Sequence, residues 1–514
     1  MNRRTIKVCC LLLTAMMILS ISLPGCSAPE TPPNILPDEK ESTLSENKSE
    51  TAETEIPVLK VVVEEFPDSL KQLNTQFSYV VSQFWKSKDM KVKVEVEYLP
   101  VVGRSAALER IRTSLMAGEG PDVLILPTNS SMDIDDEYIQ LNELLIPDVN
   151  QAMHNGLFSD ISELYDADTE LNKEALVTTV MDAGVVNEAR YTLPLFYNFP
   201  VAFVDMDQFA ETGLSTEVFD SGILSLTDAI VQSGNQKLAG CACPADFSEY
   251  ILNFFPNLLD YSEQEVLITK EEVSTYLESM QRFELLRNNT WGGGYPYYIQ
   301  EYINQEGKSF WATEGYCFHL ADLCSVFEST LYSNAEDVNL EMFPIRGLDG
   351  SLVADVTYYG AISAGCENKE LAYEFLRMFL MEDFQWGQEY IANTHDLFDD
   401  AGISIGWPVR AENALQISCD GFYKSLQRYS ADGPAERKQR KERLLEASIV
   451  EDELSILKVN IDKARYPIEA LEEKLFRVVW DDLIERGQNK ISDNEIGDLA
   501  DEWLHDLEWH MFEG

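Results

Sequence analysis

The side chains in this 514-residue sequence that could do chemistry are chiefly aromatic rings and carboxylates. The stretch WGGGYPYYIQEYINQEGKSFW at 291–311 holds the densest group of aromatic residues. Trp291 stands beside three glycines, so a loop there could present its ring to a cleft. A sugar places its C–H faces against such rings, while its hydroxyls exchange hydrogen bonds with polar side chains. This composition favours a carbohydrate-binding surface, although part of the cluster must belong to a core.

Zinc-binding spacings known from enzymes are missing from the sequence. None of the five histidines stands in HExxH or beside cysteines at zinc spacing, and GxSxG occurs once, as GISIG at 402–406. The stretch DADTELN at 166–172 alternates oxygen ligands as a calcium loop does, but it lacks the central glycine and the final glutamate, so we interpret it as a solvated turn. We therefore expect no enzyme, no cofactor and no metal. The alternative is a glycoside hydrolase, because 89 acidic residues would place two carboxylates at glycosidase distance by chance.

Length and charge limit the classes of partner. A chain of 514 residues is too long for one ordinary core, so two or more domains are expected. The formal net charge is −50, with 39 basic residues against 89 acidic ones. This balance argues against nucleic acid and against an anionic membrane surface as partners, since both require clustered lysine and arginine.

The N-terminus has the pattern of an exported lipoprotein. A basic start and a short apolar run predict a signal peptide over 1–25. The residues LPGC at 23–26 resemble the lipobox of bacterial lipoproteins, which implies cleavage before Cys26 and attachment of a lipid to its thiol. Residues 26–56 are polar and lack aromatic residues, so they are predicted to form a disordered tether. The predicted location is the extracellular face of the cell membrane, with the protein held there by its lipid.

Six cysteines remain in the predicted mature body. An exported protein permits disulfides, but six cysteines allow fifteen pairings, and buried free thiols are the alternative. The six are Cys241, Cys243, Cys317, Cys324, Cys366 and Cys419.

Strand and helix patterns alternate where the folded body begins. A β-branched strand is predicted over 59–63, a helix follows Ser69, and a second strand with every other residue apolar covers 92–98. A second helix ends at Gly118, and the apolar run DVLIL at 122–126 suits a strand that helices cover on both faces. This order predicts a doubly wound parallel sheet. The apolar stripe of the second helix comprises Leu108, Ile111, Leu115 and Met116.

Ligands of open α/β sheets bind at the carboxyl ends of the strands. Glu65 and Phe66 follow the first predicted strand, and Thr128 and Asn129 follow DVLIL. All four are therefore candidate binding residues.

The wording and order of several segments resemble the extracellular solute-binding proteins of ABC importers, family 1, which include bacterial sugar-binding proteins. The matching segments, spread over residues 57–410, are AGEGPDVLILP, YIQLNELL, ARYTLPLFYNFPVAFVDMDQF, ISAGCENKELAYEFLRMFLMEDFQ and GWPVR. The resemblance implies a periplasmic-binding-protein-like fold of two doubly wound α/β lobes joined by hinge strands, with helices at the C-terminus. It places 57–197 and 351–396 in lobe 1, and 198–350 and 397–514 in lobe 2. Crossings between the lobes are expected near 196–203, 343–350 and 396–406.

Two later helices are predicted from their patterns. Ser492 and Glu495 form a capping box that opens the last helix. The helix within 362–385 has an apolar stripe of Leu371, Phe375, Leu376, Phe379 and Leu380.

The remaining candidate binding residues come from the implied crossings and the late loop. Trp407 is the preferred single candidate, because a tryptophan between a glycine and a proline is not expected in a helix core. The others are Phe196, Tyr197, Asn198, Tyr358, Tyr359 and Arg410.

The resemblance implies a protein that captures a small solute, most simply a carbohydrate or oligosaccharide, and delivers it to the permease subunits of an ABC transporter. A peptide, a polyamine or a sensory partner protein are alternatives as the molecule bound.

Overall fold

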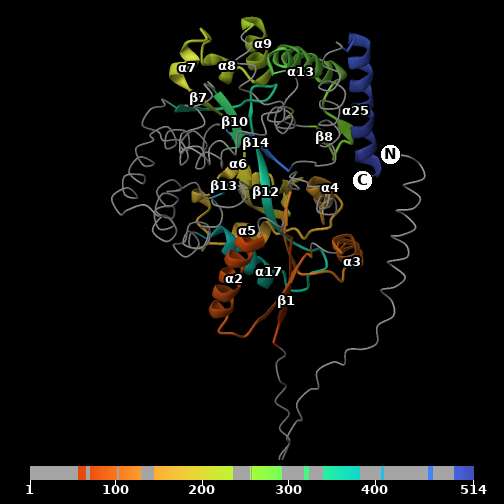
Figure 1. Ribbon diagram of the computed structural model, residues 1–514. Helices are drawn as coiled ribbons and strands as arrows, with labels where there is room; N and C mark the ends of the chain where they lie inside the picture. Colours follow the sequence, from red (N-terminus) through yellow and green to blue (C-terminus); the bar gives the residue numbers. More distant parts are fainter. Residues whose placement is uncertain are drawn as a thin grey trace, which may run out of the picture. The chain divides into compact units, whose positions relative to one another are not determined.

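A computed structural model describes eleven segments of the chain, which contain both strands and helices (Figure 1). By its internal contacts, 56–514 forms one unit distinct from 1–55. The described residues are 56–64, 70–100, 103–128, 144–234, 255, 258–291, 318–322, 340–381, 407–409, 461–466 and 491–513.

Strands of the larger sheet are β1 (Val58–Val63), β2 (Lys93–Tyr98), β3 (Val123–Pro127), β6 (Thr192–Asn198), β12 (Leu352–Ile362), β13 (Trp407–Pro408) and β14 (Ile461–Arg465). Strands of the smaller sheet are β7 (Pro200–Asp205), β10 (Phe318–Asp322) and β11 (Leu340–Pro344). Two short pairs are β4 (Val185–Val186) with β5 (Ala189–Arg190), and β8 (Leu259–Asp260) with β9 (Glu265–Val266).

The α-helices are α2 (Leu70–Ser87), α3 (Arg104–Met116), α4 (Val149–His154), α5 (Ser162–Ala167), α6 (Thr178–Asp182), α7 (Met206–Ala210), α8 (Glu217–Asp220), α9 (Ile223–Ser233), α13 (Lys270–Trp291), α17 (Lys369–Arg377) and α25 (Asp493–Glu513). Among the described segments, no helix is both long enough and apolar enough to cross a membrane.

The larger sheet runs in the order β13-β6-β12-β3-β1-β2, and β14 pairs with β12. β1 pairs in parallel with β2 and with β3, as the alternation of strands and helices predicted. β12 lies antiparallel between β3 and β6. Every residue of β3 is buried, which confirms that DVLIL forms a central strand.

Helices α2 and α17 pack together through phenylalanine rings. Phe375 of α17 lies edge-on to Phe77 and Phe84 of α2, with ring centroids 5.9 and 5.1 Å apart. The predicted apolar stripe of the helix in 362–385 is buried throughout, which confirms it. α17 also lies directly on β12, since a Cβ added at Gly360 would meet Leu376 Cδ2 at 2.6 Å. A side chain at this position would require Leu376 to shift.

Helix α3 ends at the glycines, as predicted. Gly118 has a φ of 71° and its amide donates to the Leu115 carbonyl, so the chain turns at once toward β3. Three members of the predicted stripe are buried, but Met116 is 85% exposed and its assignment to that stripe was wrong. A helix turns by about 100° per residue, so the neighbour of buried Leu115 points away from the sheet.

The smaller sheet differs from the predicted parallel winding. β7 is its central described strand, and β10 and β11 both pair with it antiparallel. Antiparallel neighbours need no crossover helix, so this part of the sheet does not repeat the strand–helix alternation of the N-terminal segment.

The chain passes between the two sheets inside two of the segments predicted as crossings. Phe199 separates β6 from β7, and 345–351 separates β11 from β12. The third predicted crossing, 396–406, lies outside the described residues. The lobe boundaries stay a prediction, but β13 and β14 come from the range predicted for lobe 2 and pair within the larger sheet.

The last helix, α25, begins with the predicted capping box. The Ser492 amide donates to Glu495 Oε2 at 2.8 Å, and the Glu495 amide donates to Ser492 Oγ at 3.4 Å. α25 packs beside α13 (Figure 1).

Candidate functional site

The carboxyl edge of the larger sheet gathers several of the predicted binding residues. β1, β3 and β6 all end there, because β3 and β6 both run antiparallel to β12. Thr128 follows β3, and Asn198 ends β6 opposite Asp355. Trp407 pairs with Tyr197, which brings the start of β13 to the same edge. Thr128, Asn198 and Trp407, which are 70 to 279 positions apart in sequence, thus meet in one row of strand ends, although the ligand-binding roles of the predicted residues stay predictions.

Thr128 and Asn198 hold the backbone at this edge. The Thr128 amide donates to the Thr357 carbonyl at 3.0 Å, and its hydroxyl donates to the Val356 carbonyl. Asn198 Oδ1 accepts a hydrogen bond from the Phe199 amide, at the point where the chain leaves the sheet. Both side chains therefore stabilise the strand ends in this structure.

The four predicted aromatic residues of β6 and β12 are all buried. Tyr359 packs edge-on against Phe158 and Tyr466, with ring centroids 6.2 and 5.5 Å apart. Tyr358 points to the opposite face, where its ring lies 6.4 Å from that of Phe196. Burial raises the pKa of Tyr197 well above its ordinary value. These contacts account for Phe196, Tyr358 and Tyr359 as packing within the sheet, and the Tyr197 side chain is fully buried.

Sequence reasoning missed an ion pair at the same edge. Arg465 Nε lies 3.1 Å from Asp355 Oδ1, and both side chains are mostly buried. The Arg465 guanidinium also donates to the Phe255 carbonyl at 3.0 Å. A lone aspartate within the apolar run LVADVTYY was a usable signal, since a buried carboxylate needs a partner. Nothing in the sequence links it to an arginine 110 residues later.

A second missed pair lies where β1 ends. Glu64 and Arg104 are both fully buried and form an ion pair. The Glu64 carboxylate also accepts from the Leu145 amide, at 3.2 Å on Oε1 and 3.0 Å on Oε2. The predicted residues Glu65, Phe66, Asn129 and Arg410 lie outside the described residues, as does the predicted lipidation site Cys26.

Trp291 and Trp407 occupy different backbone environments. Trp291 is the last residue of α13, so the expectation that a loop presents it was wrong at the level of the backbone. The helix ends where the three glycines begin, because glycine is unfavourable in a helix. Trp407 lies in a strand, outside any helix core, as expected.

Asp148 joins three distant parts of the chain. Its Oδ1 accepts from the Gln151 amide and caps α4, while Tyr261 donates its hydroxyl to Oδ2. His510 Nε2 lies 2.8 Å from the same Oδ2, so the C-terminal helix is bound to α4. Burial raises the pKa of Tyr261. Burial also lowers the pKa of nearby His154, and the carboxylates of Asp260 and Asp148 oppose that shift.

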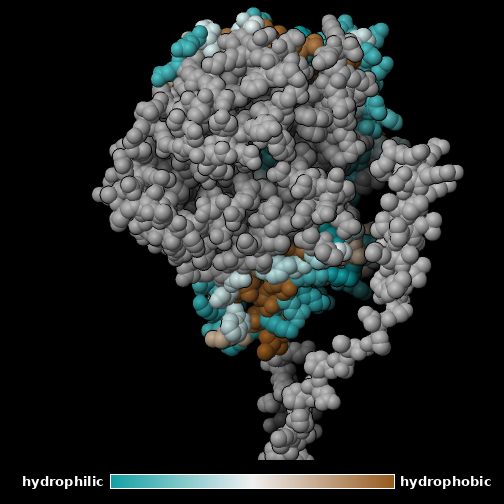
Figure 2. All heavy atoms as spheres, in the orientation of Figure 1, coloured by the Kyte–Doolittle hydropathy of each residue, from teal (hydrophilic) through white to brown (hydrophobic). Residues whose placement is uncertain are grey.

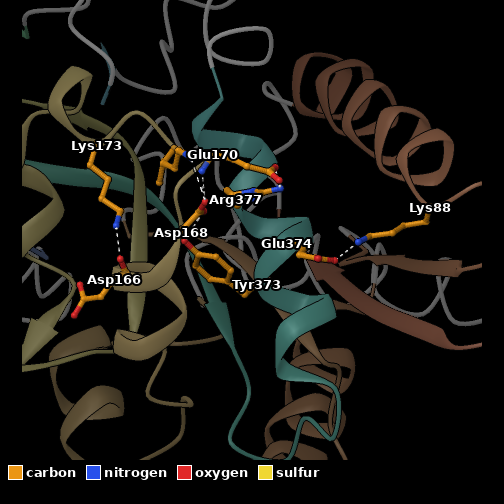
Figure 3. A network of polar contacts seen from close by, with 9 residues as sticks. Lys88, Asp166, Asp168, Glu170, Lys173, Tyr373, Glu374 and Arg377 are labelled. Carbon is orange, nitrogen blue, oxygen red and sulfur yellow. Dashed lines mark hydrogen bonds and ion pairs between the residues drawn. The ribbon is translucent and has the colours of Figure 1, made fainter.

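The stretch 166–172 is mostly exposed, as the predicted solvated turn requires, but Asp168 and Leu171 face inward. Figure 3 shows Asp168 facing Tyr373 and Arg377 of α17, at 3.0 Å from the hydroxyl and 3.2 Å from the guanidinium. The Asp168 side chain is only 3% exposed, and it also accepts from the amides of Glu170 and Leu171. A carboxylate with this many protein donors ties the turn to α17. Within the described residues, no group of three or more metal-ligating side chains could hold a metal.

Replacing Asp168 with asparagine is expected to lower the free energy of unfolding by about 1–3 kcal/mol at neutral pH, because charged hydrogen bonds to Arg377 and Tyr373 are lost. Burial alone would raise the pKa of Asp168, but its amide, hydroxyl and guanidinium donors hold it below the ordinary value. The contribution is therefore present above about pH 4 and is lost as the pH falls through the folded-state pKa. Urea unfolding at neutral pH and near pH 3 measures both quantities.

Glu170→Gln is the matched control, because Glu170 pairs with the same arginine at 2.7 Å but is 71% exposed. Its effect should stay below about 1 kcal/mol. Equal losses in the two variants, or a loss in Asp168→Asn that persists at acid pH, would contradict this account.

One cavity of about 380 Å³ lies between α3 and the strands β1 and β2, beside the turn that precedes β3. Its polar lining includes Lys60, Glu95, Arg110 and Glu119. None of the predicted binding residues lines it, so it does not coincide with the carboxyl edge.

Of the six cysteines in the predicted body, the structure describes Cys366, which is a buried free thiol. Burial raises its pKa to about 12, so the thiolate is disfavoured at neutral pH.

No family model and no curated protein matches the sequence. Solved structures do match along most of the chain. An extracellular solute-binding protein of family 1 from Alicyclobacillus acidocaldarius has a TM-score of 0.51 at 12% identity, covering 89% of this chain and 98% of that chain. The sugar-binding protein MalE from Xanthomonas citri has a TM-score of 0.51 at 14% identity, covering 89% of this chain and 100% of that chain. A de novo designed cysteine esterase has a TM-score of 0.54 at 11% identity, covering 88% of this chain and 98% of that chain.

At such low identities the likeness concerns the fold. The chain has the α/β fold of periplasmic-binding-protein-like structures, which confirms the predicted fold class. The predicted resemblance to extracellular solute-binding proteins of family 1 is likewise confirmed in the fold.

Proposed function

We propose that this chain is the substrate-binding lipoprotein of an ABC importer. It captures a small solute, a carbohydrate or oligosaccharide, by closing two hinged lobes, and it delivers the solute unaltered to permease subunits. The lipid on Cys26 holds it at the extracellular face of the cell membrane.

The observation that supports this proposal most is that the chain crosses twice between the two sheets through short connections. One passage is Phe199, directly after Asn198 at the carboxyl edge, and the other is 345–351 before β12. Strands that leave a sheet at its ligand-binding edge and enter a second sheet can act as a hinge beside the ligand. A ligand that contacts both sides then stabilises the closed arrangement.

The choice of a carbohydrate has two supports. The aromatic stretch at 291–311 supplies rings suited to sugar faces, and the MalE protein of Xanthomonas citri, which shares the fold, is named as sugar-binding.

A thermal-unfolding screen with oligosaccharides, peptides and polyamines tests the proposal. A sugar present at about 100 times its dissociation constant should add about 2.7 kcal/mol to the free energy of unfolding. Stabilisation by peptides or polyamines alone would instead support the other binding functions. Chromatography of the sugar after incubation distinguishes a hydrolase, because hydrolysis would release shorter products.

Trp407→Ala is expected to abolish the sugar-induced rise in melting temperature while the variant stays folded without sugar. Trp407 begins β13 at the carboxyl edge, where the chain returns beside Tyr197. Trp85→Ala is the matched control, because Trp85 lies at the opposite end of the sheet. Intact sugar affinity in Trp407→Ala would show that the pocket lies elsewhere.

A further inference from the structure

The end of the larger sheet where β1 and β2 begin exposes four apolar side chains. We call Ile56, Val58, Trp85 and Met90 the amino-end patch; each is between 43% and 59% exposed. Their segments lie close together: the Lys93 amide donates to the Pro57 carbonyl, and the Met90 amide donates to the Trp85 carbonyl, both at 2.9 Å. Figure 2 shows apolar side chains at this end, with hydrophilic ones on both sides.

Met90 follows Asp89 in an unusual backbone conformation. Asp89 and Met90 have φ values of 51° and 61°, two consecutive left-handed residues without glycine. Methionine rarely adopts this conformation.

Lysines surround the amino-end patch in a chain that is otherwise strongly acidic. The stretch WKSKDMKVK at 85–93 carries four lysines and one aspartate. Lys91 and Lys93 are 80% and 63% exposed, and their partners Asp89 and Glu95 are also exposed, so these pairs hold them weakly. Lys88 pairs with Glu374 of α17, as Figure 3 shows. The net charge of the chain predicted no affinity for an anionic surface, but this end is a local exception.

The predicted tether enters the body at the amino-end patch. Ile56 is the first described residue, and only 29 residues separate it from Cys26. A coil of that length spans about 30 Å, so a lipid on Cys26 would keep this end near the bilayer. Because the anchor raises the effective concentration of this end at the bilayer, even a weak affinity for the lipid surface leads to binding.

We propose that the amino-end patch docks onto the anionic phospholipid bilayer that holds the lipid anchor. The chemistry fits this partner: tryptophan is favoured at the headgroup level, short apolar side chains enter the boundary with the acyl chains, and lysines attract anionic headgroups. The strands run from this patch to the carboxyl edge, so docking points the ligand edge away from the membrane. The inference rests on the lipid anchorage in the proposed function.

Vesicle flotation tests the docking surface without the anchor. The chain carrying Cys26→Ser should float with phosphatidylglycerol vesicles at low ionic strength, and not with phosphatidylcholine vesicles. Each lysine removed should lower the partition about fivefold, so Lys91→Ser with Lys93→Ser should lower it at least tenfold. Trp85→Ser with Met90→Ser should lower it by a similar factor. Trp509→Ser is the matched control, since Trp509 on α25 is 55% exposed, compared with 44% for Trp85, and should change nothing.

Three results would overturn the docking surface: no flotation of the chain with Cys26→Ser, equal binding to both lipids, or equal effects of the Trp85 and Trp509 changes. Loss of a dimer in the Trp85 and Met90 variant, seen by sedimentation, would assign the patch to contact between copies and overturn it as well. Failure of the proposed function is separable, because Trp407→Ala should keep vesicle binding and lose sugar stabilisation, whereas the patch variants should do the reverse.

Discussion

Replacing Glu64 with alanine is expected to lower the free energy of unfolding by about 3–5 kcal/mol, the cost of leaving one charge of a buried pair without its partner. Glu64 and Arg104 are both fully buried, and Glu64 also accepts hydrogen bonds from the Leu145 amide. The change would therefore release the end of β1, the start of α3 and the segment at Leu145 together. Chemical unfolding of the purified chain measures the loss.

The chain offers a matched control for Glu64→Ala. Arg110 pairs with Glu97 from the same helix to the neighbouring strand, but the two side chains are 55% and 45% exposed. Glu97→Ala should cost less than about 1 kcal/mol. Replacing both Glu64 and Arg104 with apolar residues of similar size should cost much less than Glu64→Ala, because no charge then stays buried alone. Similar losses in Glu64→Ala and Glu97→Ala would show that burial does not decide the energy of this pair.

Much of the fold follows from local patterns in the sequence. The β-branched run of β1, the alternation in β2 and the apolar run of β3 predict three strands, and glycine with proline predicts the end of α3. These features could be predicted because each depends on residues near one another in the chain. The antiparallel pairing of β12 between β3 and β6 joins segments more than 150 residues apart, and no local periodicity encodes it.

The candidate site was predicted less completely, for a related reason. The rule for strand ends placed Thr128 at the carboxyl edge, since it needs only the direction of the strands, whereas Asn198 was chosen from the crossing that the resemblance implied. The partners of Asp355 and Asp168 were not predictable, because Arg465 and Arg377 lie 110 and 209 residues away. Charged residues look solvated in sequence, and only the fold shows which ones are buried.

Trp503→Ala is expected to destabilise the chain by about 3–5 kcal/mol, the usual cost of removing a buried tryptophan. Trp503 of α25 is 1% exposed, and its ring lies 5.8 Å from Phe255, which in turn contacts Tyr276 of α13. The loss should appear as a lower midpoint in urea unfolding. Trp509, on the same helix, is 55% exposed, so Trp509→Ala should change the midpoint little.

The contrast between these two tryptophans decides whether the C-terminal helix is part of the core. α25 contributes Trp503 to the packing around α13, and its His510 reaches Asp148 at the start of α4. A helix fixed at both points must move with the elements it joins, so destabilising it should also weaken the rise in melting temperature that the proposed function predicts with sugar. If Trp503→Ala left both stability and sugar response unchanged, α25 would be a peripheral helix, and the hinge would depend on the strands between the two sheets alone.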